Sequence, residues 1–150
     1  MPSTAEFLDF NKENNVYTCA AQFGTPIQND TIGYTFAVDT SVGMIMTTTK
    51  GCGDNCTYYN SFDMTNSSSL KNLTAEYELT IPGGYSAKGK DVKDLACTLP
   101  NLICMSDISF FAITNGTGTN GNWTWLNVFG LAPTDYFTAP DYVESLYAKK

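Results

Sequence analysis

The sequence predicts an all-β domain with one short helix at its C-terminal end. Most of the 150 residues fall into short apolar or alternating runs, separated by turns rich in Gly, Pro, Asn and Asp. Helical spacing is restricted to residues 139–150, where Val143, Leu146 and Tyr147 share one face. The chain has no internal repeat and no linker long enough to divide it, so we expect a single domain over residues 1–150.

Seven stretches are expected to form strands, because each is apolar or alternating and most end at a turn residue. In chain order they are residues 15–24, 34–40, 43–49, 73–81, 90–99, 102–114 and 123–133. Between them, the polar stretches 51–60, 65–72 and 115–122 are expected to form loops. The sequence PGGY at 82–85 predicts a turn, since proline is excluded from central ladder positions and two glycines permit positive φ.

Charge and composition exclude several classes of function. Acidic residues outnumber basic ones 15 to 8, giving a net charge of −7, which argues against nucleic acid and anionic membrane surfaces as partners. The absence of His removes the usual Ser-His and Cys-His catalysis and the commonest metal ligand, so we expect no metal and no cofactor. No apolar run approaches the roughly 20 residues that a membrane-spanning helix needs.

Cysteines and glycosylation motifs indicate a secreted, lumenal or cell-surface location. The start MPSTAEFLDF does not have the pattern of a signal peptide, so either the protein is intracellular or the numbering begins at a mature or engineered end, and the cysteines and glycosylation motifs favour the second. The spacing of Cys52 and Cys56 favours a small disulfide loop over a metal site, and a turn at 100–101 favours a bond between Cys97 and Cys104. Cys19 is then free, buried or bonded to another chain. Six Asn-X-Ser/Thr motifs exceed the number expected by chance, and they begin at Asn29, Asn55, Asn66, Asn72, Asn115 and Asn122.

Asp39 is the residue with the most functional interest. It directly follows the apolar alternating run 34–38 and precedes Thr40 and Ser41. A carboxylate at the end of a buried strand is costly unless hydrogen bonds compensate its lost hydration. Two interpretations are open at this point: Asp39 is a functional carboxylate, or it is an acidic cap that ends the strand and forms a turn.

Seven motifs in this order resemble the N-terminal lobe of the pepsin-like aspartic proteases. They are Tyr17 with FGTP and Gln28, VDTSVGMIM, the loop between Cys52 and Cys56, SFDMTNSSS, YELTIPGGYSAKG followed by Asp94, NVFGLAP, and YVESLYAKK. Each motif is weak by itself, but together they span about 130 residues. The resemblance implies a lobe of mostly antiparallel strands ending in a short helix, and it supports the bond between Cys52 and Cys56.

The resemblance also implies a mechanism and a site. In this family two aspartates, one from each lobe, share a proton because like charges so close cannot both ionise. They activate a water molecule that attacks the peptide carbonyl. Asp39 matches the aspartate of this lobe, and Thr40 matches the residue that supports it by hydrogen bonds across the lobes. Ser41 stands in place of a glycine, and Tyr85 is the nearest tyrosine to the family's flap position.

Several departures from the family pattern argue against activity. Ser41 adds a Cβ where the backbone passes closely, and Val42 replaces a serine that hydrogen-bonds the aspartate. Pro or Gly occupies the flap tyrosine position, with Tyr85 two or three places later, and Met46 replaces the flap-supporting tryptophan. Asp94 and two later aspartates also lack the context of a second catalytic motif.

We therefore expect a pepsin-like lobe that is non-catalytic by itself and acts as a glycosylated extracellular binding or structural module for a protein or peptide ligand. The alternative is half of an active aspartic endopeptidase, completed by a second lobe or by an identical chain across a two-fold axis. In either case Asp39 lies at the open edge of the lobe.

Overall fold

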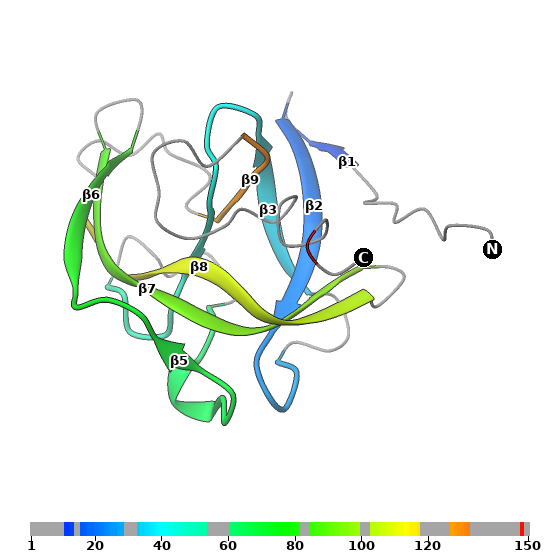
Figure 1. The fold of residues 1–150 in the computed structure, drawn as a ribbon. Helices are drawn as coiled ribbons and strands as arrows, with labels where there is room; N and C mark the ends of the chain where they lie inside the picture. Colours follow the sequence, from blue (N-terminus) through cyan, green and yellow to red (C-terminus); the bar gives the residue numbers. More distant parts are fainter. Residues whose placement is uncertain are drawn as a thin grey trace.

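The computed structural model describes residues 11–13, 16–28, 33–53, 61–81, 85–99, 103–117, 127–132 and 148. This part of the chain is built almost entirely of strands, which confirms the all-β prediction (Figure 1). The strands are β1 Asn11–Glu13, β2 Val16–Phe23, β3 Tyr34–Asp39, β4 Ile45–Thr48, β5 Lys71–Asn72, β6 Tyr77–Ile81, β7 Tyr85–Thr98, β8 Ile103–Thr117 and β9 Val128–Gly130. One 3₁₀ turn, η2, covers Met64–Asn66.

The strands form one sheet that closes on itself. Its order is β1-β2-β3-β9-β4-β8-β7-β5, with β6 also paired to β7. An additional pairing joins β2 to β7, so that six strands complete a ring from β2 through β3, β9, β4, β8 and β7. Closure removes the open edges of these six strands and encloses a core.

The two longest strands, β7 and β8, run side by side across the molecule (Figure 1). Their antiparallel pairing contains two irregularities, one at Lys88/Gly89 and one between Asp94 and Ala96. Gly89 has no space for a side chain, since a Cβ there would lie 2.2 Å from the carbonyl oxygen of Ala112 and 2.8 Å from the ring of Phe111. Glycine at this irregularity lets β7 stay paired with β8 where a side chain would collide with the β8 backbone.

Apolar side chains pack into two clusters. The larger one centres on Phe23, whose ring lies 4.7 Å from that of Phe110 and 5.8 Å from that of Phe36. The second cluster includes Met46 and Phe111 and packs against Tyr77 of β6. Because side chains alternate along a strand, the adjacent residues Phe110 and Phe111 of β8 serve the two clusters separately.

Several boundaries differ from the sequence-based expectation. The strands β7 and β8 are longer than 90–99 and 102–114, because the irregular positions bend the pairing without ending it. Within 65–72, expected as a loop, the structure places β5 and part of η2. The predicted helix over 139–150 lies outside the described residues except for Ala148, so it stays a prediction. No helix in the described part of the chain is long and apolar enough to cross a membrane.

Candidate functional site

Asp39 is the last residue of β3, and it is half-buried. Its Oδ1 atom accepts two hydrogen bonds from Ser41, one from the backbone N–H at 2.7 Å and one from the hydroxyl at 2.6 Å. Among the described residues, Ser41 is the only donor to this carboxylate, so Oδ2 remains open. Ser41 thus supplies the carboxylate with a backbone donor and a hydroxyl donor together.

The strand β9 fixes the backbone around Asp39. It lies between β3, with which it pairs in parallel, and β4, with which it pairs antiparallel. The backbone N–H of Leu131 donates to the carbonyl of Asp39 at 2.9 Å, and the N–H of Ala132 donates to the carbonyl of Val42 at 3.0 Å. The loop from β3 to β4, which carries Thr40 and Ser41, is therefore anchored to a segment about 90 residues later.

Gly130 lies where this loop and β9 approach most closely. A Cβ at this position would lie 2.3 Å from the carbonyl oxygen of Val42 and 2.4 Å from that of Met44. The backbone N–H of Gly130 donates to the Met44 carbonyl at 3.1 Å. Because both neighbours are backbone atoms, no side-chain rotation can relieve the contact, and only glycine fits.

The buried side chain of Asn127 joins the two strands that flank β9. Its Oδ1 accepts from the backbone N–H of Thr48 at 2.8 Å and from the Thr48 hydroxyl at 3.1 Å. Its Nδ2 donates to the carbonyl of Thr35 in β3 at 3.4 Å. Sequence reasoning missed this residue, since a single Asn before an apolar run carries no local signal for such a role.

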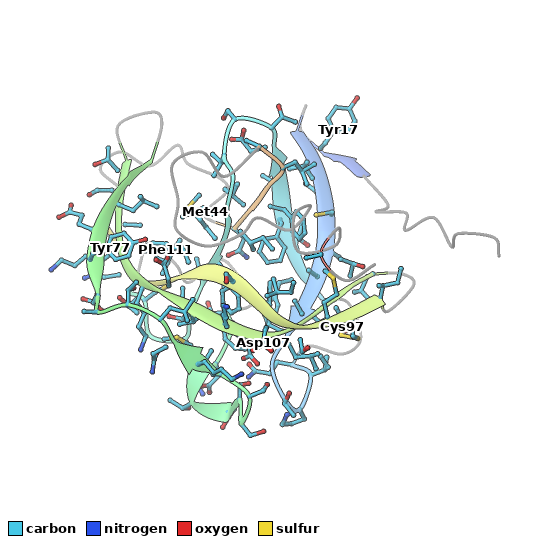
Figure 2. All side chains as sticks on the ribbon, in the orientation of Figure 1. Tyr17, Met44, Tyr77, Cys97, Asp107 and Phe111 are labelled. Carbon is cyan, nitrogen blue, oxygen red and sulfur yellow. A yellow bond between two sulfur atoms is a disulfide. The ribbon has the colours of Figure 1, made fainter. Side chains whose placement is uncertain are left out.

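The other residues proposed for this site have different surroundings. Thr40 and Ser41 are exposed at the end of the sheet. Met46 is buried in the second apolar cluster, with Met44 packed against that cluster (Figure 2). Tyr85 is the first residue of β7, and the structure does not describe its side chain.

A clamp of two residues holds segment 61–70 against the turn after β2. The Gln28 side chain donates to the carbonyl of Asp63 at 2.7 Å and accepts from the Asp63 backbone N–H at 2.8 Å. The Asp63 carboxylate accepts from the backbone N–H of Thr65 at 3.0 Å and thereby caps η2. Hydrogen bonds from the Thr65 side chain and from Lys50 lower the pKa of Asp63.

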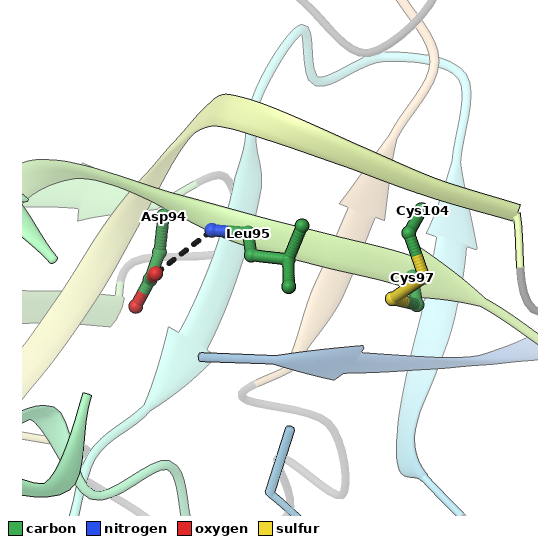
Figure 3. The surroundings of a disulfide bond; sticks show 4 residues. All are labelled: Asp94, Leu95, Cys97 and Cys104. Atoms are coloured by element: carbon green, nitrogen blue, oxygen red, sulfur yellow. Dashed lines mark hydrogen bonds between the residues drawn. A yellow bond between two sulfur atoms is a disulfide. The ribbon is translucent and has the colours of Figure 1, made fainter. Parts of the chain in front are cut away.

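Asp94 is almost completely buried and belongs to a polar network. Its Oδ1 accepts from the Ser69 hydroxyl at 2.5 Å and from the backbone N–H of Leu95 at 2.8 Å (Figure 3). The Ser69 hydroxyl lies 2.6 Å from that of Thr25, and the Ser67 hydroxyl accepts from the Thr25 backbone N–H at 3.0 Å. Asp94 therefore links segment 61–70 to β7 and takes no part in the Asp39 site described here.

Tyr77 and Asp91 fix the base of the β6–β7 hairpin. The Tyr77 hydroxyl donates to Asp91 at 3.0 Å, and its ring lies 5.2 Å from that of Phe111 (Figure 2). The backbone of Asp91 accepts from Leu73 at 2.9 Å and donates to the Thr74 hydroxyl at 2.9 Å. Burial raises the pKa of Asp91, and the hydrogen bond from Tyr77 opposes that shift. Neither residue carries a local sequence signal for this pairing.

Cysteine pairing agrees with one sequence prediction directly. Cys97 of β7 and Cys104 of β8 are bonded (Figure 3). Cys52 is also disulfide-bonded, but Cys56 lies outside the described residues, so that pairing stays a prediction. Cys19 is a buried free thiol, and burial raises its pKa to about 12.

Half of the glycosylation motifs fall in the described part of the chain. Asn66, Asn72 and Asn115 are exposed there. The other three predicted positions, Asn29, Asn55 and Asn122, lie outside the described residues. Among the described residues no group of three acidic or cysteine side chains lies close enough together to hold a metal ion.

Comparison of the chain with protein-family models and with curated proteins finds no match. The assignment of function therefore rests on the geometry around Asp39 and on the motif resemblance.

Proposed function

We propose that the chain is a pepsin-like lobe that does not hydrolyse peptides by itself and serves as a glycosylated extracellular binding or structural module. The observation that carries this proposal is the position of Asp39. It ends β3 at the point where β9 inserts between β3 and β4, and a glycine allows the close crossing. A carboxylate held in this way is what the motif resemblance leads us to expect at Asp39.

Contacts between the motifs support the pepsin-like assignment. The GTP turn and the SFDMTNSSS segment, two separate motifs of the resemblance, meet through Gln28 with Asp63 and through Thr25 with Ser67. Asp94, which follows the hairpin at the family's usual spacing, bonds Ser69 of the same segment. Motifs that are weak one by one thus form a connected arrangement.

The surroundings of Asp39 support the absence of activity. Peptide hydrolysis in this family needs two carboxylates that share a proton. In the described residues Asp39 accepts only from Ser41, and no second carboxylate bonds to it. The extracellular location is supported by the bond between Cys97 and Cys104, since disulfides persist in oxidising compartments.

The alternative, half of an active endopeptidase, is favoured by one observation. Thr40 and Ser41 are exposed beside Asp39 at the end of the sheet, where a second lobe or an identical chain has access to the open Oδ2. In that case a partner supplies the second carboxylate, and activity depends on association.

A proteolysis assay on the purified chain tests the two functions. A denatured protein substrate is incubated between about pH 3 and pH 6, an interval whose lower part overlaps the window of about pH 1.5 to 4.7 in which a dyad of this kind shares one proton. We expect no cleavage by the chain, by Asp39→Asn, or by the matched control Asp107→Asn, which alters an exposed carboxylate on β8. A hydroxyl-containing transition-state mimic is likewise expected to leave the melting temperature unchanged.

Cleavage that Asp39→Asn abolishes and Asp107→Asn retains would instead establish the endopeptidase. A rate that rises with the square of protein concentration would identify a homodimer as the active species. Cleavage that appears only on adding a separate second lobe would identify a heterologous pair.

A further inference from the structure

We infer that Asn72 carries an N-linked glycan that covers the outer edge of β5, and so keeps this edge from pairing with another chain. The inference rests on the proposed extracellular function and assigns a specific site and role within it. β5 is the last strand of the sheet order, it pairs only with β7 among the described strands, and it lies at the outer side of the molecule (Figure 1).

The backbone of Asn72 faces outward at this edge. Asn72 is opposite Val92 of β7, and the next residue, Leu73, donates its N–H to the carbonyl of Asp91 at 2.9 Å. Residues of an antiparallel pair alternate between bonding across the pair and facing away from it. The N–H and C=O of Asn72 therefore point away from β7 and are available to a strand of another molecule.

Apolar surface adjoins this open edge. Leu73 is 44% exposed, and Tyr17 is the only other large apolar residue so exposed in the described part of the chain. An exposed apolar side chain beside unpaired strand groups favours association. Lys71, the one charged residue of β5, pairs with Asp107 at 2.8 Å but stays 65% exposed, so it adds charge to this edge without covering the backbone groups of Asn72.

Leu73 is the middle residue of the motif Asn72-Leu73-Thr74, and because successive side chains of an extended segment leave on opposite faces, a glycan on Asn72 shields the strand edge and not the face that carries Leu73. In the transfer step, the Asn72 amide nitrogen attacks C1 of an oligosaccharide carried by a lipid diphosphate. The bond between C1 and the diphosphate oxygen breaks, an N–C1 bond forms, and the amide proton leaves with the lipid diphosphate. The attached sugar is bulky and hydrated, and it covers the neighbouring surface.

The test uses the full chain, secreted from a eukaryotic cell behind a cleavable leader. Peptide mapping after glycosidase treatment reports which asparagines carried glycan, and light scattering during size-exclusion chromatography reports association. Asn72→Gln is expected to lose the mass of one glycan and to shift toward oligomers. Leu73→Ser keeps the motif and is expected to stay glycosylated and monomeric. The double variant is expected to be unglycosylated at residue 72 but closer to monomeric than Asn72→Gln.

Enzymatic deglycosylation of the folded wild type gives a second route that avoids any folding defect of the variants, and it is expected to produce the same oligomers. The inference is overturned if Asn72 is bare while Asn66 or Asn115 is occupied, a result that leaves the extracellular function standing. It is also overturned if the deglycosylated chain remains as monomeric as the glycosylated one. Absence of glycan from every motif overturns this inference and the extracellular function together.

Discussion

Replacing Gly130 by Ala is expected to destabilise the protein strongly through a contact between backbones. The added Cβ would lie 2.3 Å and 2.4 Å from the carbonyl oxygens of Val42 and Met44, whereas real Cβ contacts stay beyond 3.0 Å. Strand β9 must then move away from the loop between β3 and β4. That movement weakens the hydrogen bond from Gly130 to Met44 and the neighbouring one from Ala132 to Val42.

The magnitude follows from these two effects. Overpacking of a close contact costs about 1–3 kcal/mol. Loss of one or two backbone hydrogen bonds adds about 1–2 kcal/mol. A total of about 2–5 kcal/mol is a large part of the stability of a typical domain, which is about 5–15 kcal/mol. With a slope of about 2 kcal/mol per molar urea, the midpoint is expected to fall by about 1–2.5 M.

Urea denaturation followed by circular dichroism measures this change, with Gly51→Ala as the matched control. A Cβ at Gly51 meets no atom within 4 Å, so its cost comes only from the positive φ of +88° and is about 1 kcal/mol. Hydrogen exchange of the Leu131 and Ala132 amides is expected to accelerate in Gly130→Ala and not in the control. Equal midpoints for the two variants would refute the reasoning about this crossing.

Three further predictions concern buried polar groups. Ser69→Ala removes one of the two donors to buried Asp94 and is expected to cost about 1–3 kcal/mol in the same urea assay, and an unchanged midpoint would contradict the network. The pKa of Asp91 is raised by burial despite the Tyr77 hydrogen bond, so its protonated form favours the folded state. The contribution of Asp91 to the free energy of unfolding is therefore complete below the ordinary Asp pKa of 3.8, and it is lost as the pH rises through the raised pKa of the folded state. Asp91→Asn removes the titrating group, so the free energy of unfolding is expected to fall less over this pH range. The Cys19 thiol, buried and with its pKa raised to about 12, is expected to resist thiol reagents until urea unfolds the chain, and rapid labelling of the native protein would contradict its burial.

Local pattern was sufficient for the strands that supply the core. The alternation in 34–40 and the apolar run in 43–49 predicted β3 and β4, because burial on at least one face leaves a periodic trace in the sequence. The apolar stretch 102–114 predicted a strand, but it did not predict that both faces of this strand are buried. Phe110 and Phe111 belong to different apolar clusters, and this division depends on which distant side chains pack against each face of β8.

Short and polar elements escaped prediction for a different reason. β1 and β5 contain polar and charged residues without periodicity, and they are strands because β2 and β7 offer backbone partners. The extension of β7 through Gly89 could not be anticipated either, since glycine usually indicates a break. Here it permits β7 to remain paired closely with β8 through an irregular position instead.

The candidate site was predicted in part. The place of Asp39 at a strand end followed from the residues on either side of it. The hydroxyl of Ser41, the buried amide of Asn127 and the pair of Tyr77 with Asp91 were not predicted. The bonds of Asn127 join residues 79 positions apart, and such distant pairing has no signature in a single sequence.

The insertion of β9 between β3 and β4 also bears on how the chain acquires its structure during synthesis. The two flanking strands are made early, but each has one edge that only residues 128–130 can fill. The native contacts are therefore of high contact order, and their closure is expected to be slow. Until the ribosome delivers β9, the nascent domain exposes two incomplete strand edges to its surroundings, which makes this interval the period of greatest risk for misassembly and the one in which a chaperone has most to protect.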